Sequence, residues 1–238
     1  MLRSPAIPIL DPKAVRANVP GHDLHLHTVF TDGKSTIEAY LDRAIELGLE
    51  HVGFPEHCNL KTTWLRTFVP ALEEQRKRVA GRINVHWGIE AKGMNRAGAL
   101  AATPEMIQAA EYVYGAFHSS LTDTPFPSLE RDAAIEMEFD VTMAMIRARS
   151  CHAVAHPGGL SMKFHGAFPN ELFDQLAQNA SQHDVALELN PGYGADIGQQ
   201  LDVCIKYGCR VVLGSNAHEL EELGQVVDTL RSSLERAR

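Results

Sequence analysis

Two histidines separated by one residue, His25 and His27, carry the clearest chemical signal in the first part of the chain. Alternate side chains of a β-strand point to opposite faces, so a strand here would place both imidazoles on one side, together with Asp23. Polar groups on the buried side of a strand are costly unless they find a partner. A metal ion would be such a partner. The alternative is a pair of histidines on an exposed strand face, which a short motif leaves open.

Other residues that could bind a metal follow further expected strands. Seven short apolar segments are typical of strands, at about residues 22–27, 51–54, 83–90, 112–117, 152–155, 185–189 and 210–213. A single histidine at a strand end is usually a structural hydrogen-bonding group, but their coincidence at so many ends indicates a shared site. The candidate ligands at these ends are His25, His27, His57, Glu90, His118, His156, Asn216 and His218.

The segments between these strands predict helices, at about residues 35–47, 70–80, 104–110, 128–149, 169–183 and 219–236. Strands that alternate with helices favour a parallel sheet covered by helices. We expect an α/β fold with a single domain over residues 21–238, a distorted (β/α)7 TIM-like barrel, after an irregular lead-in at residues 1–20. An open, doubly wound sheet is the alternative. Active sites of such barrels lie at the carboxyl ends of the strands.

Composition narrows the class of protein. The chain has 238 residues, of which 45% are hydrophobic, so a packed core is easily built. A formal net charge of -8 and the lack of a Lys/Arg run argue against nucleic acid as the partner and favour a small molecule. No segment approaches the ~20 apolar residues of a membrane helix, and the first residues lack a signal-peptide pattern. We therefore expect a cytoplasmic protein with no membrane partner. The sequence carries no signal for the oligomeric state.

Several motifs occur in an order that resembles the PHP (polymerase and histidinol phosphatase) family, over about residues 22–220. The resemblance implies two or three divalent metal ions at the rim of the barrel and hydrolysis of a small phosphate monoester, as in histidinol-phosphate phosphatase. The motifs are His25-Leu26-His27 with Thr31-Asp32-Gly33, Glu56-His57, Gly88-Ile89-Glu90, His118-Ser119, Ala155-His156-Pro157-Gly158 and Gly214-Ser215-Asn216-Ala217-His218.

The same resemblance implies a place for each ligand. Glu90 would bridge two of the ions, and Glu90, Asn216 and His218 are the expected catalytic residues. The first ion takes His25, His27, Glu90 and Asn216; the second takes Glu90, His118 and His156; the third takes Asp32, His57 and His218.

The mixture of imidazole and carboxylate ligands suits Zn, Mn or Fe(II) and does not decide among them. Water bound between such ions becomes hydroxide near neutral pH, and the ions neutralise a phosphoryl group. A phosphatase of this kind needs no side-chain nucleophile. The same hydroxide can also attack a carbonyl group, so a metal-dependent amide or lactone hydrolase is the alternative enzyme.

Two positions depart from the family pattern. The family usually has aspartate where this chain has Asn216, whose amide coordinates through oxygen but brings no charge. Either the first ion is bound more weakly, or catalysis tolerates the change, or the chain has lost activity, by nature or by deliberate substitution. Phosphatase members often have histidine at the position of Asp32. A carboxylate there favours Mn or Fe, or leaves only two ions firmly held.

Three basic residues just beyond strand ends, Lys92, Arg96 and Lys163, are the candidates for binding the phosphate group of the substrate. Arginine pairs with phosphate oxygens in a bidentate manner, and lysine binds them as a point charge. For each of the three, a solvated surface charge is the alternative. His165, in the same expected loop as Lys163, is a candidate general acid for the leaving group.

Overall fold

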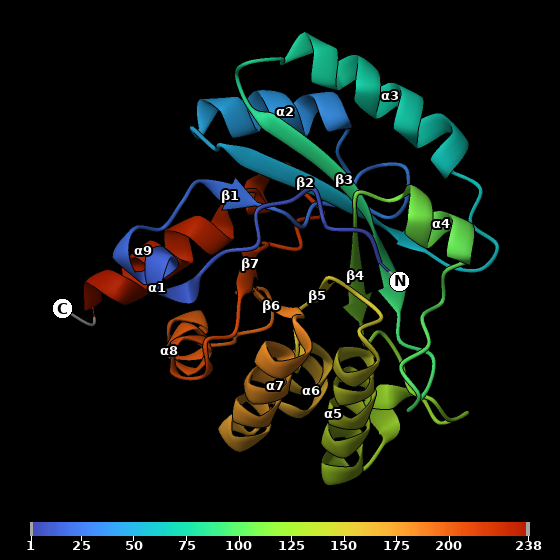
Figure 1. Ribbon diagram of the computed structural model, residues 1–238. Coiled ribbons are helices and arrows are strands. Elements are labelled where there is room, and N and C mark those ends of the chain that lie inside the picture. Colours follow the sequence, from blue (N-terminus) through green and yellow to red (C-terminus); the bar gives the residue numbers. More distant parts are fainter. Residues whose placement is uncertain (1, 237–238) are drawn as a thin grey trace.

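A parallel sheet of seven strands forms the centre of the protein (Figure 1), as seen in a computed structural model that describes residues 2–236. The strands follow one another in chain order, and each pairs in parallel with the next. They are β1 (His22–Asp23), β2 (His51–Cys58), β3 (Asn84–Lys92), β4 (Tyr112–Ala116), β5 (Ala153–Val154), β6 (Ala186–Leu189) and β7 (Val211–Leu213).

The chain just after β1 closes the sheet against the chain after β7. The backbone N–H of Leu24 donates to the carbonyl of Leu213 at 2.8 Å, and that of His27 donates to the carbonyl of Ala217 at 2.8 Å. Leu26 and Ala217 form an isolated parallel bridge. The predicted distorted (β/α)7 barrel is therefore confirmed, and the open, doubly wound alternative is wrong.

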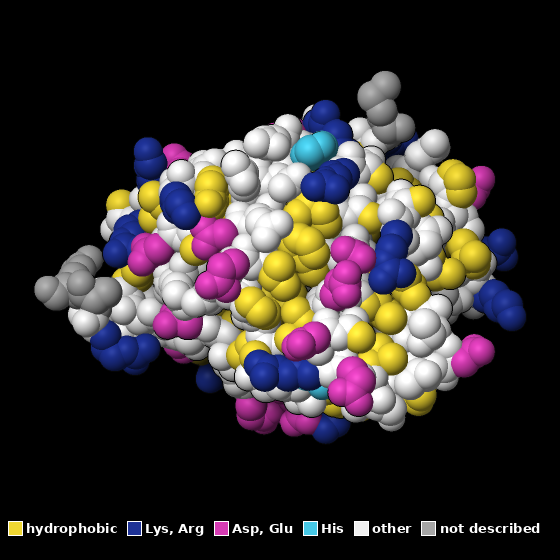
Figure 2. Space-filling model, turned by 90° about the horizontal axis from the view of Figure 1, so that it is seen from below, with side chains coloured by type: hydrophobic (Ala, Val, Ile, Leu, Met, Phe, Trp, Pro, Cys, Tyr) yellow, Lys and Arg dark blue, Asp and Glu magenta, His cyan; other side chains and the backbone are white. Residues whose placement is uncertain are grey.

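Helices surround the sheet, with α2 to α4 on one side and α5 to α8 on the other (Figure 1). Seen from the side of α5 to α8, hydrophobic side chains form a band between acidic and basic ones (Figure 2). None of the helices within residues 2–236 is long and apolar enough to cross a membrane. They are α1 (Pro12–Ala17), α2 (Ile37–Glu46), α3 (Leu65–Arg78), α4 (Pro104–Ala109), α5 (Arg131–Ala148), α6 (Gly159–His165), α7 (Asn170–His183), α8 (Ile197–Tyr207) and α9 (Gln225–Arg236), with 3-10 turns η1 (Phe126–Ser128) and η2 (Leu220–Glu222).

Three helices, α1, α6 and α8, were not expected from the sequence. The lead-in is not wholly irregular, because Asp11 caps α1 by accepting from the N–H of Lys13 at 2.9 Å. Two of these helices have only 6 and 7 residues, too few to show a helical repeat of apolar positions. The last expected helix is split into η2 and α9.

The interior of the barrel is apolar below the rim. Side chains from β4, β5, β6 and β7 form one buried cluster there, and several of them are alanines. Tyr114 is fully buried in this cluster, and its ring lies 5.2 Å from the ring of His25. The polar residues at the carboxyl ends of the strands therefore rest on an apolar floor.

A buried carboxylate joins α5 to α6, the short helix that follows His156. Glu138 is only 1% exposed, and it accepts from the backbone N–H of Leu160 at 3.2 Å and from that of Ser161 at 2.7 Å. These two N–H groups belong to the first turn of α6, where a helix cannot satisfy them itself. Glu138 thus fixes the start of α6 beside the rim.

We expect Glu138→Ala to lower the free energy of unfolding by about 2 kcal/mol or more, since it leaves buried N–H groups without an acceptor. Glu136→Ala is the matched control, because Glu136 is exposed on the same helix and its loss should cost less than ~0.5 kcal/mol. Urea denaturation of both variants measures the difference. Equal losses would show that Glu138 does not anchor α6.

Candidate metal centre

The side chain of Glu90, at the end of β3, lies at the centre of a group of histidines. Its carboxylate has no exposed surface. Five imidazoles approach it from other strand ends. The nitrogen-to-oxygen distances to Glu90 are 2.8 Å for His57 Nδ1, 2.9 Å for His156 Nε2, 3.2 Å for His118 Nε2, and 3.5 Å for both His25 Nε2 and His27 Nε2.

A second carboxylate lies on the outer side of this group. Asp32 Oδ2 is 3.4 Å from His57 Nε2 and 3.5 Å from His218 Nε2. The ring of His27 stacks on that of His57, with centroids 4.1 Å apart. His57 therefore faces Glu90 with one ring nitrogen and Asp32 with the other.

The candidate ligands form three overlapping groups, in each of which the possible ligand atoms lie within 4.8 Å of one another. The first group lacks the Asn216 that was expected there, the second has His57 in place of His156, and the third adds His27 to the expected residues. The groups are His25, His27 and Glu90; His57, Glu90 and His118; and His27, Asp32, His57 and His218.

These residues fit divalent ions, because two of their buried polar atoms lack a hydrogen-bond partner. Within residues 2–236 these are Nδ1 of His27 and Oδ1 of Asn216. Buried polar groups in native proteins are almost always paired. In addition, Nε2 of His25 and Nε2 of His27 face each other at 3.1 Å. Imidazole and carboxylate groups that converge in this way are typical ligands of Zn, Mn or Fe.

Glu188 on β6 holds two of the histidines in place. It is fully buried, its Oε1 lies 2.7 Å from Nδ1 of His25, and its Oε2 accepts from the backbone N–H of His156 at 2.6 Å. A carboxylate that binds Nδ1–H leaves the lone pair of Nε2 free for a metal, as is common around metal-bound histidines. The sequence analysis did not assign this role to Glu188. A charged residue within the apolar strand Ala186–Leu189 was the available signal.

Asp23, which shares a face with His25 in the strand pattern, is in none of the three candidate ligand groups. Its carboxylate accepts from the backbone N–H groups of Ser215 and Gly224, both at 2.8 Å. Burial raises the pKa of Asp23 to about 6. It therefore ties β1 to the chain after β7 and supports the centre through the backbone.

Glu56 holds the loop that carries Asp32. It is fully buried, and its carboxylate accepts from the backbone N–H of Thr28 at 2.9 Å and from the hydroxyl of Thr31. Gly33 belongs to the same loop, and a Cβ there would overlap the carbonyl oxygen of His27. The Thr31-Asp32-Gly33 motif thus fits closely against the His25-Leu26-His27 motif.

The protonation of the centre follows from burial and from neighbouring charges. Burial disfavours charge on His25, but in the metal-free protein the carboxylates of Glu188 and Glu90 outweigh it and raise the pKa to about 10. A metal ion bound at Nε2 would therefore displace a proton. His27 has its pKa lowered by burial and by the imidazoles of His57 and His25. Burial opposes ionisation of Glu90, yet the surrounding histidines, His118 first, hold its pKa well below the usual value. Glu90 is therefore an anion within a group of nitrogen ligands.

Asn216 lies at the edge of the centre, in the left-handed region of the backbone at φ 53°. Asparagine adopts this conformation more readily than most residues. Its side-chain Nδ2 donates to the hydroxyl of Tyr193 at 3.1 Å, which leaves its buried Oδ1 without a hydrogen-bond partner. The ring of Tyr193 in turn lies 5.3 Å from that of His156.

The basic residues expected to bind phosphate are placed differently from one another. Lys92 is half-buried at the end of β3, and its ammonium donates to the hydroxyl of Ser119, next to His118. Arg96 is exposed and pairs with Asp140 at 2.8 Å. Of these two, Lys92 is the one that contacts a residue beside the histidines.

The segment with Lys163 and His165, which was expected to be a loop, is the helix α6. Lys163 is exposed on α6, with its ammonium 5.3 Å from the centre of the ring of Phe164. His165 Nε2 lies 3.3 Å from the carbonyl oxygen of Phe126. Both side chains therefore contact α6 or the neighbouring turn η1, and neither contacts the histidines around Glu90.

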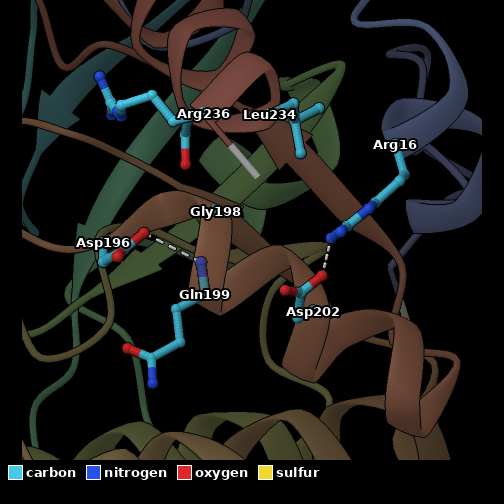
Figure 3. A pocket seen from close by; sticks show the side chains of 8 residues that line it. Arg16, Asp196, Gly198, Gln199, Asp202, Leu234 and Arg236 are labelled. Atoms are coloured by element: carbon cyan, nitrogen blue, oxygen red, sulfur yellow. Dashed lines mark hydrogen bonds and ion pairs between the residues drawn. The ribbon is translucent and has the colours of Figure 1, made fainter. Parts of the chain in front are cut away.

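A hollow of about 500 Å³ between α1, α8 and α9 contains none of the histidines (Figure 3). Arg16 pairs with Asp202 across it, and Asp196 caps α8 by accepting from the N–H of Gln199 at 3.0 Å. The hollow is therefore separate from the metal centre. Its lining residues are Arg16, Asp196, Gly198, Gln199, Asp202, Ser233, Leu234 and Arg236.

Comparison with known families gives one decisive match. The model of the PHP domain family matches residues 23–192, which include the ligands from His25 to His156. The chain belongs to the PHP domain family. The match covers most of the barrel of this PHP chain, and the predicted family membership is confirmed.

Similar proteins agree with this membership. The PHP chain is 24% identical over 233 residues to a "probable phosphatase" of Shewanella piezotolerans, covering 90% of this chain and 87% of that protein. It is 23% identical to the "probable phosphatase YcdX" of Escherichia coli, with 88% and 83% covered. A solved histidinol phosphate phosphatase of Lactococcus lactis, complexed with zinc, L-histidinol and phosphate, superposes with a TM-score of 0.72 at 15% identity, covering 91% and 93%. That likeness supports the fold.

We expect purified protein to bind about two or three divalent ions per chain and Glu90→Gln to lower the affinity for at least one of them by about 10-fold or more. The amide keeps the shape of the side chain but removes the anion that faces five imidazoles. Glu221→Gln is the matched control, because Glu221 is exposed. Elemental analysis after dialysis against Mn, Zn or Fe(II) measures the content. Equal metal content in all three proteins would exclude Glu90 as a ligand.

Proposed function

We propose that this PHP protein is a metal-dependent phosphatase that hydrolyses a small phosphate monoester at the rim of the barrel. One observation carries the proposal: a buried carboxylate, Glu90, has five imidazoles within 3.5 Å. Such a group holds several divalent ions close together only if an anion lies between them. The nine expected ligand positions supply nitrogen, carboxylate and amide donors for that purpose.

Divalent ions at this centre would supply a nucleophilic oxygen near neutral pH and neutralise the charge of a phosphoryl group. The chain's own residues do the rest. Glu90 keeps its negative charge among the histidines and would offset the repulsion between neighbouring cations. Glu188 fixes the orientation of His25, and Glu56 fixes the loop of Asp32. Rigid ligands of this kind keep the centre in one geometry.

Lys92 is the best placed of the three basic residues to bind a phosphate oxygen of the substrate. It is half-buried and already points its ammonium to the hydroxyl beside His118. A phosphate group near His118 would attract this ammonium as a point charge. Arg96 and Lys163 would contribute only after leaving Asp140 and Phe164.

The similar proteins support a small phosphorylated substrate, and the mixed imidazole and carboxylate donors leave the metal among Zn, Mn and Fe. Two relatives carry the name "probable phosphatase", and the Lactococcus lactis protein was solved with zinc, L-histidinol and phosphate. We therefore propose a monoester of a small alcohol. Cleavage of amides or lactones by the same centre is the competing activity.

We expect release of phosphate from small monoesters, histidinol phosphate and p-nitrophenyl phosphate among them, with Mn, Zn or Fe(II) present. A chelator should abolish the activity and the added metal should restore it. His118→Ala should lower kcat/KM by roughly 100-fold or more, since even residues that only orient metal ligands are worth 10–100-fold. His183→Ala is the matched control. His183 is the last residue of α7, and its Nδ1 contacts the carbonyl oxygen of Asn179 at 2.9 Å, so it belongs to none of the candidate ligand groups.

Activity on amides or lactones without any on phosphate esters would contradict the proposal. Phosphate release that persists after chelation and full metal removal would contradict the role of the ions.

Asn216 favours a second candidate, a family member with reduced activity. Its neutral amide adds no negative charge to the first ion site. Asn216→Asp should therefore raise both metal affinity and the rate of phosphate release, measured side by side with the wild-type protein. A variant that binds metal and still releases no phosphate from any ester would argue against a phosphatase and for a metal-binding role.

A further inference from the structure

An apolar pocket lies beside the metal centre, between α6, α7 and α8. Its volume is about 330 Å³, at the lower end of the range for small-molecule sites. The helices that border it belong to the face that carries the band of hydrophobic side chains (Figure 2). Its apolar wall is formed by Met162, Ala167, Phe168, Phe173 and Val203. Its polar side is lined by Asn170, Asp196, Gln199 and Gln200.

A narrow cavity adjoins this pocket on the side of His156. The cavity has a volume of only about 10 Å³, and His156 and Tyr193 are among its lining residues. It shares Met162 and Gln200 with the apolar pocket. A few side chains therefore separate the pocket from His156, one of the imidazoles that contact Glu90.

A polar side chain in the wall of the narrow cavity has a donor to spare. Asn190 is 3% exposed, and its Oδ1 accepts from the backbone N–H of Gly192 at 2.8 Å. Its buried Nδ2 has no hydrogen-bond partner. An unpaired buried donor costs free energy, which an acceptor atom of a ligand would offset.

Tyr193 lines the narrow cavity together with His156. Its ring lies 5.3 Å from that of His156, and its hydroxyl accepts from Nδ2 of Asn216. Glycines flank it on both sides, and Gly194 has a φ of 76°. Tyr193 is thus the part of the wall of the narrow cavity that lies against His156.

We propose that the apolar pocket binds the organic half of the phosphate ester, a mainly hydrocarbon group with one hydrogen-bond acceptor placed for Asn190. This inference rests on the proposed phosphatase function and specifies its substrate class. The phosphoryl group would lie at the histidines while the alcohol part fills the pocket. Esters of strongly polar alcohols would leave the apolar wall in contact with water.

The test uses the metal-loaded protein and a series of n-alkyl phosphates from ethyl to hexyl. We expect kcat/KM to rise about fourfold for each added methylene group, which corresponds to about 0.8 kcal/mol. Ala167→Trp, which fills the pocket, should remove this dependence on chain length. Ala133→Trp is the matched control, because Ala133 is exposed on α5 and the substitution should leave the series unchanged.

A binding measurement without turnover provides a second readout. Equilibrium titration with 1-naphthol, an apolar alcohol with its own fluorescence, should give binding to the wild-type protein and Ala133→Trp. Binding to Ala167→Trp should be at least about 10-fold weaker, the loss expected when an apolar ring is excluded from its site.

The outcomes separate the two proposals. Equal kcat/KM across the alkyl series, or naphthol binding that Ala167→Trp does not weaken, overturns the pocket assignment and leaves the phosphatase proposal standing. Failure to hydrolyse any ester, with naphthol binding intact, overturns the phosphatase function and with it the assignment of the pocket to a phosphate ester.

Discussion

The structure depends on one electrostatic constraint: the carboxylate of Glu90 is buried without any exposed surface and needs positive partners. A buried charge is costly unless it is paired or bound to a metal. Five imidazoles converge on it from segments that lie far apart in the sequence, between His25 and His156. Imidazoles satisfy an anion only in part, and divalent ions between these groups would pair the carboxylate and the nitrogen lone pairs at once. That arrangement explains why atoms such as His27 Nδ1 and Asn216 Oδ1 lack other partners.

The barrel converts this constraint into a fixed geometry. Parallel strands end at the same rim, so residues at their ends meet without long loops. Glu188 then sets the ring of His25, and Glu56 holds the loop of Asp32. Below the rim, tyrosines and alanines fill the barrel and exclude water from the lower side of the centre. The chain after β7 returns to β1 through the pair Leu26 and Ala217, which brings Asn216 and His218 to the same edge.

The sequence was sufficient to predict the barrel, because strand periodicity is a local signal. The ligand assignment, with Asp32 at the third ion, came from the resemblance to the PHP family. It did not reveal the helices α1 and α6, which are too short to show a helical repeat. The roles of several individual residues depend on tertiary contacts, which the sequence does not show. Glu188, which contacts His25 across the barrel, was left without a role, and Asp23 binds the backbone N–H groups of Ser215 and Gly224. Arg96 stands next to the expected site in sequence, but its partner Asp140 lies on another element.

The most direct test of this account is anomalous X-ray diffraction from crystals of the protein grown with Mn or Zn, recorded at the absorption edge of the metal. The account predicts at least two ions, one on each side of the Glu90 carboxylate. Each ion should lie at an ordinary ligand distance of about 2.0–2.2 Å from a carboxylate oxygen and from the surrounding imidazole nitrogens. Ions bound only at the protein surface, or a Glu90 carboxylate paired with histidines and with no ion near it, would contradict the account.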